Sequence, residues 1–252
     1  MALEGMPFTR DSDPGDASGD WTAMNLTWLG HSTFLMEINE KQNVLLDPWL
    51  QGNPASPADY ILPPIQTILL SHGHGDHTGD AVSIAAKNNA KVICNYEISL
   101  WLDSKGVNTC SPMNKGGSQR AGDITVTMTH AFHSSGMQDG DKVIYGGEPA
   151  GFIIELPDGR RIYFAGDTAV FGDMSLIAKL YAPDLAMLPI GDLFTMGPRE
   201  AALAVELLGV KKVIPMHYGT FPALTGTPDA LRELVGADVD VLTLEAGVAF
   251  DY

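Results

Sequence analysis

Hydrophobic and polar positions alternate along the first part of the chain with the two-residue period of β-strands. This pattern predicts strands within 25–38 and at 44–46, joined by a polar turn, and a buried apolar strand at 65–70. Apolar residues at 79–88 recur at helical spacing, which predicts a helix directly after that strand. The proline-rich stretch 51–64 predicts a loop between them.

Strands and helices alternate more regularly towards the C-terminus. Further strands are expected at 92–94, 124–128, 152–156, 161–165, 185–188, 213–216 and 239–244, and helices at 98–105, 173–180, 197–208 and 228–235. The segments 114–118 and 136–151 are rich in glycine, and we expect them to be loops. Most strands run straight into helices, with hairpins mixed in. The pattern therefore predicts an α/β fold of mixed sheets with outer helices, forming one domain over residues 24–252.

Residues 1–23 differ from the rest because they are polar, acidic and rich in Gly, Asp and Ser. They hold no apolar set that could join a core, so we expect a flexible extension, tag-like or from an alternative start, with the native start at Met24. They also lack the apolar stretch of a signal peptide. No apolar run in the chain approaches the roughly 18 residues of a transmembrane helix, so no membrane partner is expected.

Composition narrows the function classes. The net charge of −16 argues against a nucleic-acid surface, which needs Lys and Arg to neutralise phosphates. A small anionic substrate stays compatible with this charge, because bound divalent ions would dominate the local field. The two cysteines, Cys94 and Cys110, do not make a disulfide framework, which favours a reducing, cytoplasmic location.

The strongest chemical signal is the turn between the strand at 65–70 and the helix that follows. It carries His72, His74, Asp76 and His77, three of the seven histidines of the chain. His72 and His74 are two residues apart, so an extended backbone points both rings the same way, while Asp76 and His77 come after the bend. Such a set suits two metal ions sharing one pocket. Imidazole and carboxylate donors without cysteine favour Zn, Mn or Fe.

Three more donors stand at the ends of other predicted strands. His133 follows the strand at 124–128, Asp167 follows the strand at 161–165, and His217 follows the strand at 213–216. The ends of parallel strands meet at one edge of a sheet, so we expect these side chains near the histidine turn. A carboxylate such as Asp167 has two oxygens and can bridge two ions about 3.5–4 Å apart.

These residues carry a resemblance to a known superfamily. The turn at 71–77 with its downstream donors is similar to the His-x-His-x-Asp-His signature of the metallo-β-lactamase superfamily. The segments 28–34, 131–135, 165–168, 194–198 and 216–218 resemble a widespread group of metal-dependent hydrolases related to the L-ascorbate 6-phosphate lactonases. The resemblance spans nearly all of 24–247. It implies a four-layer αβ/βα sandwich with the site at one edge of its two sheets.

The resemblance also implies a role for each donor. The first metal would be held by His72, His74 and His133, and the second by Asp76, His77 and His217, with Asp167 as the bridge. We expect two divalent ions, Zn before Mn or Fe. His31, in a Gly-His-Ser turn, would lie beside the metals as a catalytic or substrate contact, whereas His130 matches no ligand position.

The expected reaction is hydrolysis of a small-molecule ester or lactone. Two cations lower the pKa of a shared water to about 7, and Asp76 would orient the resulting hydroxide or accept its proton. Superfamily members that hydrolyse antibiotics carry Cys at the position of Asp167, and oxygen-reducing diiron members carry Glu at the position of His74, so neither activity is expected. Lys115, Thr195 and Tyr218 are candidate substrate contacts.

Rival functions remain open at this point. A phosphodiesterase or other phosphoester hydrolase would use the same metal core, with Lys115 on a phosphate. A catalytically idle metal-binding protein and an oxidoreductase are the other two alternatives. The expected partner is a small molecule, and the sequence also allows a homo-oligomer.

Overall fold

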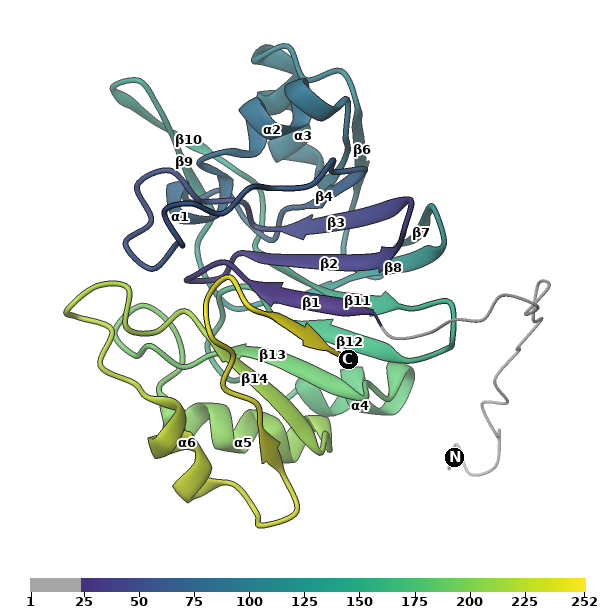
Figure 1. The fold of residues 1–252 in the computed structure, drawn as a ribbon. Coiled ribbons are helices and arrows are strands. Elements are labelled where there is room, and N and C mark those ends of the chain that lie inside the picture. The colour runs from purple at the N-terminus through teal and green to yellow at the C-terminus, as the bar shows by residue number, and fades with distance from the viewer. Residues whose placement is uncertain (1–23) are drawn as a thin grey trace, which may run out of the picture.

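Two seven-stranded sheets lie face to face at the centre of the structure, a computed structural model that describes residues 24–252 (Figure 1). The prediction of a flexible extension at 1–23 lies outside the described residues. The first sheet has the order β16 (Ala249–Asp251), β1 (Asn25–Trp28), β2 (Phe34–Asn39), β3 (Gln42–Leu46), β4 (Thr67–Leu69), β5 (Lys91–Asn95) and β6 (Cys110–Met113). The second has the order β15 (Asp240–Val241), β14 (Lys212–Met216), β13 (Leu185–Pro189), β12 (Arg161–Phe164), β11 (Ala150–Glu155), β8 (Ile124–His130) and β7 (Ser118–Ala121).

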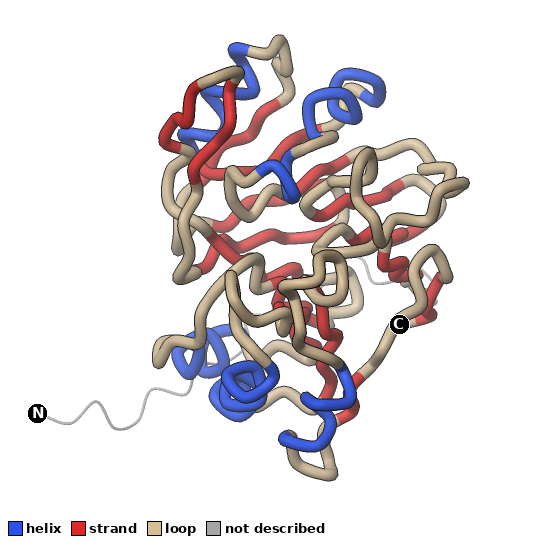
Figure 2. The backbone as a smooth tube through the Cα atoms, turned by 90° about the vertical axis from the view of Figure 1, so that its left-hand side faces the viewer, coloured by secondary structure: helices blue, strands red, loops and turns tan. Residues whose placement is uncertain are grey.

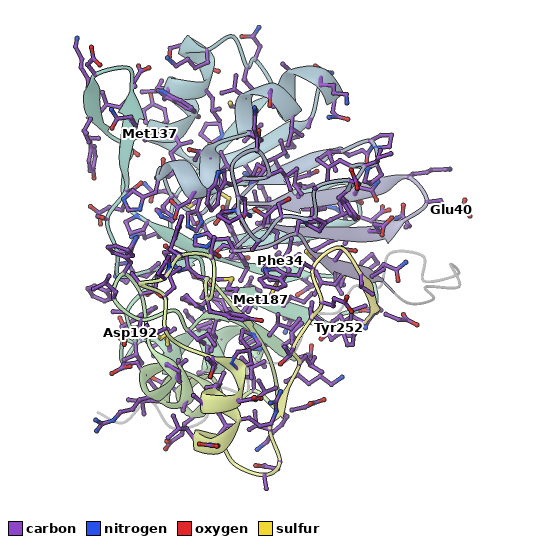
Figure 3. All side chains as sticks on the ribbon, turned by 60° about the vertical axis from the view of Figure 1, so that its left-hand side comes forward. Phe34, Glu40, Met137, Met187, Asp192 and Tyr252 are labelled. Atoms are coloured by element: carbon purple, nitrogen blue, oxygen red, sulfur yellow. The ribbon has the colours of Figure 1, made fainter. Side chains whose placement is uncertain are left out.

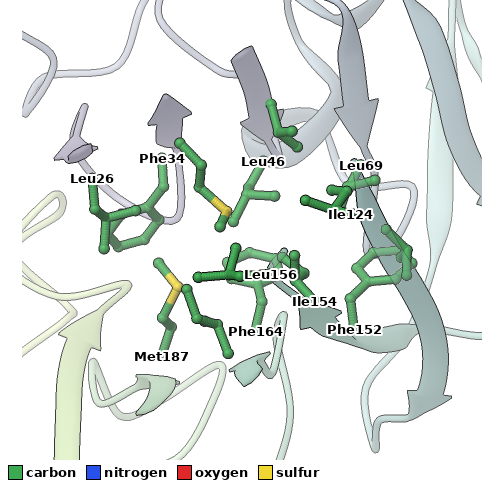
Figure 4. Packing of buried hydrophobic residues seen from close by; sticks show 14 of the residues in the cluster. Leu26, Phe34, Leu46, Leu69, Ile124, Phe152, Ile154, Leu156, Phe164 and Met187 are labelled. Carbon is green, nitrogen blue, oxygen red and sulfur yellow. The ribbon is translucent and has the colours of Figure 1, made fainter. Parts of the chain in front are cut away.

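The main core fills the space between the two sheets. Alternate residues of each strand point into it, as the two-residue period requires. Figure 4 shows Phe34 and Leu46 of the first sheet facing Phe164 and Met187 of the second. The rings of Phe34 and Phe164 meet edge to face with their centroids 6.4 Å apart.

Helices cover the outer faces of both sheets. Leu35, whose neighbours face the main core, packs outward under the helices α2 (Ala81–Asn88) and α3 (Tyr96–Ser104). The second sheet is covered by α4 (Met174–Tyr181), α5 (Pro198–Leu208) and α6 (Pro228–Leu234). The layers run helix, sheet, sheet, helix, which confirms the predicted four-layer αβ/βα sandwich. None of the helices among the described residues has the length and apolarity needed to cross a bilayer.

Some predicted elements were wrong. The segment 136–151, expected to be a loop, contains a hairpin of β9 (Gly136–Asp139) and β10 (Lys142–Tyr145) around Gly140. Its two-residue turn, Gly140-Asp141, has glycine at the first position, which is typical of hairpins, but the other glycines of the segment masked the strands. The sequence pattern also missed β6, β7 and β16, which are short edge strands. β6 contains a proline, which lacks the N–H of a ladder hydrogen bond and therefore suits an edge position.

Other differences concern element ends. The helix expected at 79–88 begins at Ala81 as α2, and a separate short helix that was not predicted, α1 (Gly75–Thr78), precedes it. The strand expected at 239–244 is reduced to the two residues of β15. α1 places the second half of the histidine turn on helical backbone, one turn earlier than predicted.

The pairing directions place the ends of several strands at one edge of the sandwich. β1 and β3 are both antiparallel to β2, and β3 is parallel to β4. In the second sheet β8 runs parallel to β12 and β14 by the same reasoning. Figure 2, which looks onto the left-hand side of Figure 1, shows this edge covered mainly by loops. In Figure 3, Met137 and Asp192 lie on this side and Glu40 lies on the opposite side.

Candidate metal centre

Three imidazoles form the first donor group at this edge. His72 and His74 follow β4, and His133 follows β8. Their ligand atoms all lie within 4.8 Å of one another, with His72 Nε2 3.0 Å from His74 Nδ1. His72 is fully buried, whereas the other two rings are partly open to solvent. The sequence prediction placed these three side chains together, and the fold brings them together.

A second group lies next to the first. It contains Asp76 and His77 from α1, His217 from the end of β14, and His31 from the turn after β1. Asp76 Oδ2 is 3.9 Å from both His77 Nε2 and His217 Nε2. Four segments of the chain that are far apart in sequence therefore supply this group and the first one.

Asp167 joins the two groups. Its Oδ2 lies 3.0 Å from His217 Nε2, 3.3 Å from His77 Nε2, 3.6 Å from His133 Nε2 and 3.9 Å from His72 Nε2. The carboxylate is 2% exposed. One oxygen faces both groups, which differs from the expected bridge through two oxygens. The other, Oδ1, accepts no hydrogen bond from any described residue.

Two observations indicate that the donor atoms could bind divalent ions. Atoms bound tetrahedrally to zinc at 2.0–2.1 Å lie about 3.4 Å apart, and the spacings around Asp167 Oδ2 scatter about that value. His77 Nε2 is buried and has no hydrogen-bond partner within 24–252, although a carboxylate oxygen lies near it. Buried polar atoms without partners are uncommon, so a cation is the natural partner for this one.

Asp47, which the sequence reasoning missed as a site residue, supports His77 from behind. Its Oδ2 lies 2.7 Å from His77 Nδ1 and accepts from the Ser71 hydroxyl at 2.5 Å, while its Oδ1 accepts from the Ser71 N–H at 2.7 Å. A carboxylate only accepts, so His77 carries a proton on Nδ1. The only sequence signal for Asp47 was its position directly after a predicted strand; its nearness to the histidine turn comes from the pairing of β3 with β4.

His31 and Asp76 form a second supporting contact. His31 Nε2 lies 3.1 Å from Asp76 Oδ2, and its Nδ1 lies 2.9 Å from Thr220 Oγ1. The ring is fully buried against His217, with ring centroids 3.9 Å apart. The backbone of His31 is left-handed, with φ 55°, a conformation that side-chain-bearing residues adopt mainly at turns and functional sites.

These contacts shift the pKa values of the site. Burial lowers the pKa of His31 to about 4, against the opposing effect of its bond to Asp76. Burial alone would raise the pKa of Asp76, but the hydrogen bond from His31 and the nearby His77 hold it below its usual range. Burial would lower the pKa of His77, yet the carboxylates of Asp167 and Asp47 outweigh it and raise that pKa. Positive charge is therefore favoured at His77, where a cation would bind.

A pocket of about 320 Å³ opens onto the two groups. Its lining consists of His74, Asp76, His133, Ser134, Asp167, Phe194, His217 and Phe221. The three predicted substrate contacts are not among these residues. Thr195 directly follows Phe194, Tyr218 stacks on Trp28, and Lys115 Nζ lies 2.9 Å from His130 Nδ1. Their roles stay predictions.

Comparison with known proteins places this geometry in a family. Residues 42–218 match the family model described as "Beta-lactamase superfamily domain". The chain belongs to this superfamily. The matched stretch contains every donor of both groups except His31.

Similar proteins show to which group within the superfamily the chain belongs. The chain is 55% identical over 225 residues to a protein of Solibacter usitatus, covering 89% of this chain and 98% of that one. It is 50% identical to a protein of Koribacter versatilis, covering 86% and 93%. Both are named UPF0173 metal-dependent hydrolase. A solved structure, described as a novel metallo hydrolase from the archaeon Ignicoccus hospitalis, is similar with 34% identity and a TM-score of 0.80, covering 92% and 99%. The chain is thus a metal-dependent hydrolase of this superfamily.

Proposed function

We propose that the site holds two divalent metal ions and hydrolyses an ester or lactone bond in a small molecule. The observation that carries the proposal is the position of Asp167 Oδ2, within 3.0–3.9 Å of imidazole nitrogens from both donor groups. A single buried carboxylate oxygen between two sets of imidazoles is the arrangement expected of a bridge between two cations.

The ligands would divide as the two groups do. His72, His74 and His133 would hold one ion, Asp76, His77 and His217 the other, and Asp167 both. Bound divalent ions polarise the oxygen that gains charge and lower the pKa of a shared water to about 7. Zn is expected first, with Mn or Fe as alternatives.

The supporting residues would position the reacting groups. Asp76 is held as a carboxylate by His31, so it can accept a hydrogen bond or a proton from the attacking water. Since a carboxylate only accepts, His31 carries its proton on Nε2, and its Nδ1 accepts from the Thr220 hydroxyl. His31 thereby fixes Asp76 at the mouth of the pocket.

The remaining expectations belong to the same proposal. Both thiols, Cys94 and Cys110, are free, which supports a cytoplasmic location. The partner is a small-molecule substrate that fits a pocket of about 320 Å³, and a homo-oligomer stays compatible. Nucleic acid is not an expected partner at a net charge of −16.

The test removes the first donor group. A variant with both His72→Ala and His74→Ala should lose metal at that group and nearly all hydrolysis, measured by elemental analysis and by acid release from a panel of esters and lactones. His130→Ala is the matched control, because His130 lies outside both groups. Full metal content in the double variant would refute the assignment of the ligands.

A further inference from the structure

We propose that the pocket takes an uncharged ester or lactone whose substituent beyond the reacting carbonyl is apolar, an alkyl chain or an aromatic ring. This inference rests on the proposed function and adds the substrate class. It comes from the part of the pocket that the metal centre does not use.

The lining of the pocket divides into two zones. The polar zone is made by the proposed metal ligands and Ser134, whose Oγ lies 3.3 Å from His74 Nε2. Beyond it the wall is formed by Phe194 and Phe221. No Lys or Arg of the described chain lines this pocket. A substrate held by the ions at one end therefore meets aromatic carbon at the other.

Phe221 is a fixed wall. Its ring stacks on Trp49, with centroids 5.9 Å apart and planes inclined by 27°, and lies T-shaped to the ring of His31, also with centroids 5.9 Å apart. Phe221 is nevertheless 37% exposed, so part of the ring is free to contact a ligand. A preformed aromatic surface of this kind binds apolar groups without first having to become ordered.

Phe194 is held at the opening by an unusual loop. The two residues before it, Asp192 and Leu193, have left-handed backbones with φ 67° and 54°. The Asp192 carboxylate accepts from the Leu193 N–H at 2.7 Å, and the Phe194 N–H donates to the Asp192 carbonyl at 2.6 Å. The outcome is a Phe that is 59% exposed at the pocket. Strained backbone that keeps a large apolar side chain out of the core is typical of a functional position.

Charge argues against an anionic substituent. A negative group beyond the ions would find no cation on the wall and would have to leave water to lie against aromatic carbon. Lys115, the candidate phosphate contact, instead lies 2.9 Å from His130 Nδ1 and 4.0 Å from Glu148. The wall thus favours burial of apolar surface and disfavours a second charge.

Three lactones that share the same ring and differ in its substituent test the proposed preference for an apolar substituent. They are γ-butyrolactone, γ-octalactone, which adds a butyl chain, and an analogue whose chain ends in a carboxylate. With the Zn-loaded protein and acid release as the readout, kcat/KM should be at least roughly 10-fold higher for γ-octalactone than for the other two. A best rate with the carboxylate analogue, or equal rates with and without the butyl chain, would overturn the inference and leave the proposed function standing.

Variants locate the effect. Phe194→Ala and Phe221→Leu should erase most of the preference for the butyl chain, measured in each variant as the ratio of kcat/KM for γ-octalactone to kcat/KM for γ-butyrolactone. Tyr96→Ala, which truncates an aromatic residue on α3 that is 55% exposed, should retain the preference. If the Phe variants keep the full preference, the aromatic wall is not the binding surface.

A binding measurement separates the two proposals. 3-Butylcyclopentanone carries the chain at the ring position that matches γ-octalactone but has no bond to hydrolyse, so it should raise the Tm of the wild type more than cyclopentanone does. In Phe194→Ala the two ketones should give equal shifts. This result without any lactone turnover would reject the proposed reaction and support the apolar wall. Equal Tm shifts of the wild type with both ketones would refute the proposal that the aromatic wall binds the chain.

Discussion

Replacing Asp47 by Asn tests how the site prepares His77 for a metal ion. The carboxylate accepts from His77 Nδ1 at 2.7 Å, which leaves the lone pair on Nε2, the atom that faces Asp167 Oδ2 at 3.3 Å. The carboxamide of Asn offers one acceptor in place of two. The Ser71 N–H already uses the acceptor at Oδ1, so an NH₂ group would face His77 Nδ1. His77 must then move its proton to Nε2 or leave two donors in contact.

The magnitudes follow from these contacts. Mutation of a carboxylate that supports a metal-bound histidine typically weakens metal affinity about 10–100-fold, or about 1.4–2.8 kcal/mol. Loss of a charge-assisted bond should also cost the metal-free protein about 1.5–3 kcal/mol. Asp47→Ala should cost more, because it leaves the buried Ser71 N–H without a partner and places Ala at φ 41°, where Asn is tolerated better.

Urea unfolding of the metal-free proteins and calorimetric titration with Zn²⁺ would measure both effects. The matched control is Asp80→Asn, since Asp80 accepts from the N–H groups of Leu50 and Gln51 but contacts no histidine. It should lower stability without weakening metal binding. Wild-type Zn²⁺ affinity in Asp47→Asn would show that Asp47 does not set the tautomer of His77.

Three further predictions use other parts of the site. Asp167→Asn should weaken binding of the second ion and lower turnover on the order of 100-fold, a larger effect than its effect on stability. Two tightly bound ions by elemental analysis, together with near-normal turnover, would show that Asp167 is not the bridge. Burial lowers the pKa of His31 to about 4 in the folded protein, below its unfolded value of 6.5. Its contribution to the free energy of unfolding is therefore complete above pH 6.5 and is lost as the pH falls through 4. Relative to His31→Asn, metal-free wild type should lose about 3 kcal/mol over that window in urea unfolding, and parallel curves would contradict this. Gly191→Ala would place a Cβ 2.0 Å from the His217 carbonyl oxygen, so it should lower the free energy of unfolding by about 1–3 kcal/mol and reduce metal occupancy of the second donor group. The control is Gly172→Ala, whose Cβ would meet nothing within 4 Å. An unchanged Tm in Gly191→Ala would refute the prediction.

The sequence was most informative where function and local pattern coincide. His72, His74, Asp76 and His77 are adjacent in the chain, so their cluster needed no knowledge of the fold. The more distant donors could be placed because strand ends gather at one edge, a rule that the pairing of β8, β12 and β14 obeys. Long apolar strands and capped helices were predicted for the same reason, since burial and periodicity are local properties.

What the sequence could not supply depends on contacts between loops. Asp47 before Pro48 looks like an ordinary strand end, and only the packing of β3 beside β4 brings it under His77. Thr220 and Phe221 lie in a loop whose path no periodicity describes. The single-oxygen approach of Asp167 depends on a side-chain rotation that no pattern encodes.

The hydrogen bond from the His217 N–H to the His31 carbonyl, 3.1 Å long, links the two sheets where both residues have left-handed backbones. Each proposed ion would reinforce that link, because His72 and His77 come from the first half of the chain and His133 and His217 from the second. Every tenfold rise in free metal above its Kd would then add about 1.4 kcal/mol against separation of the halves. A cell short of metal would lose the enzyme to proteolysis as well as to inactivity, so its abundance would report the metal supply.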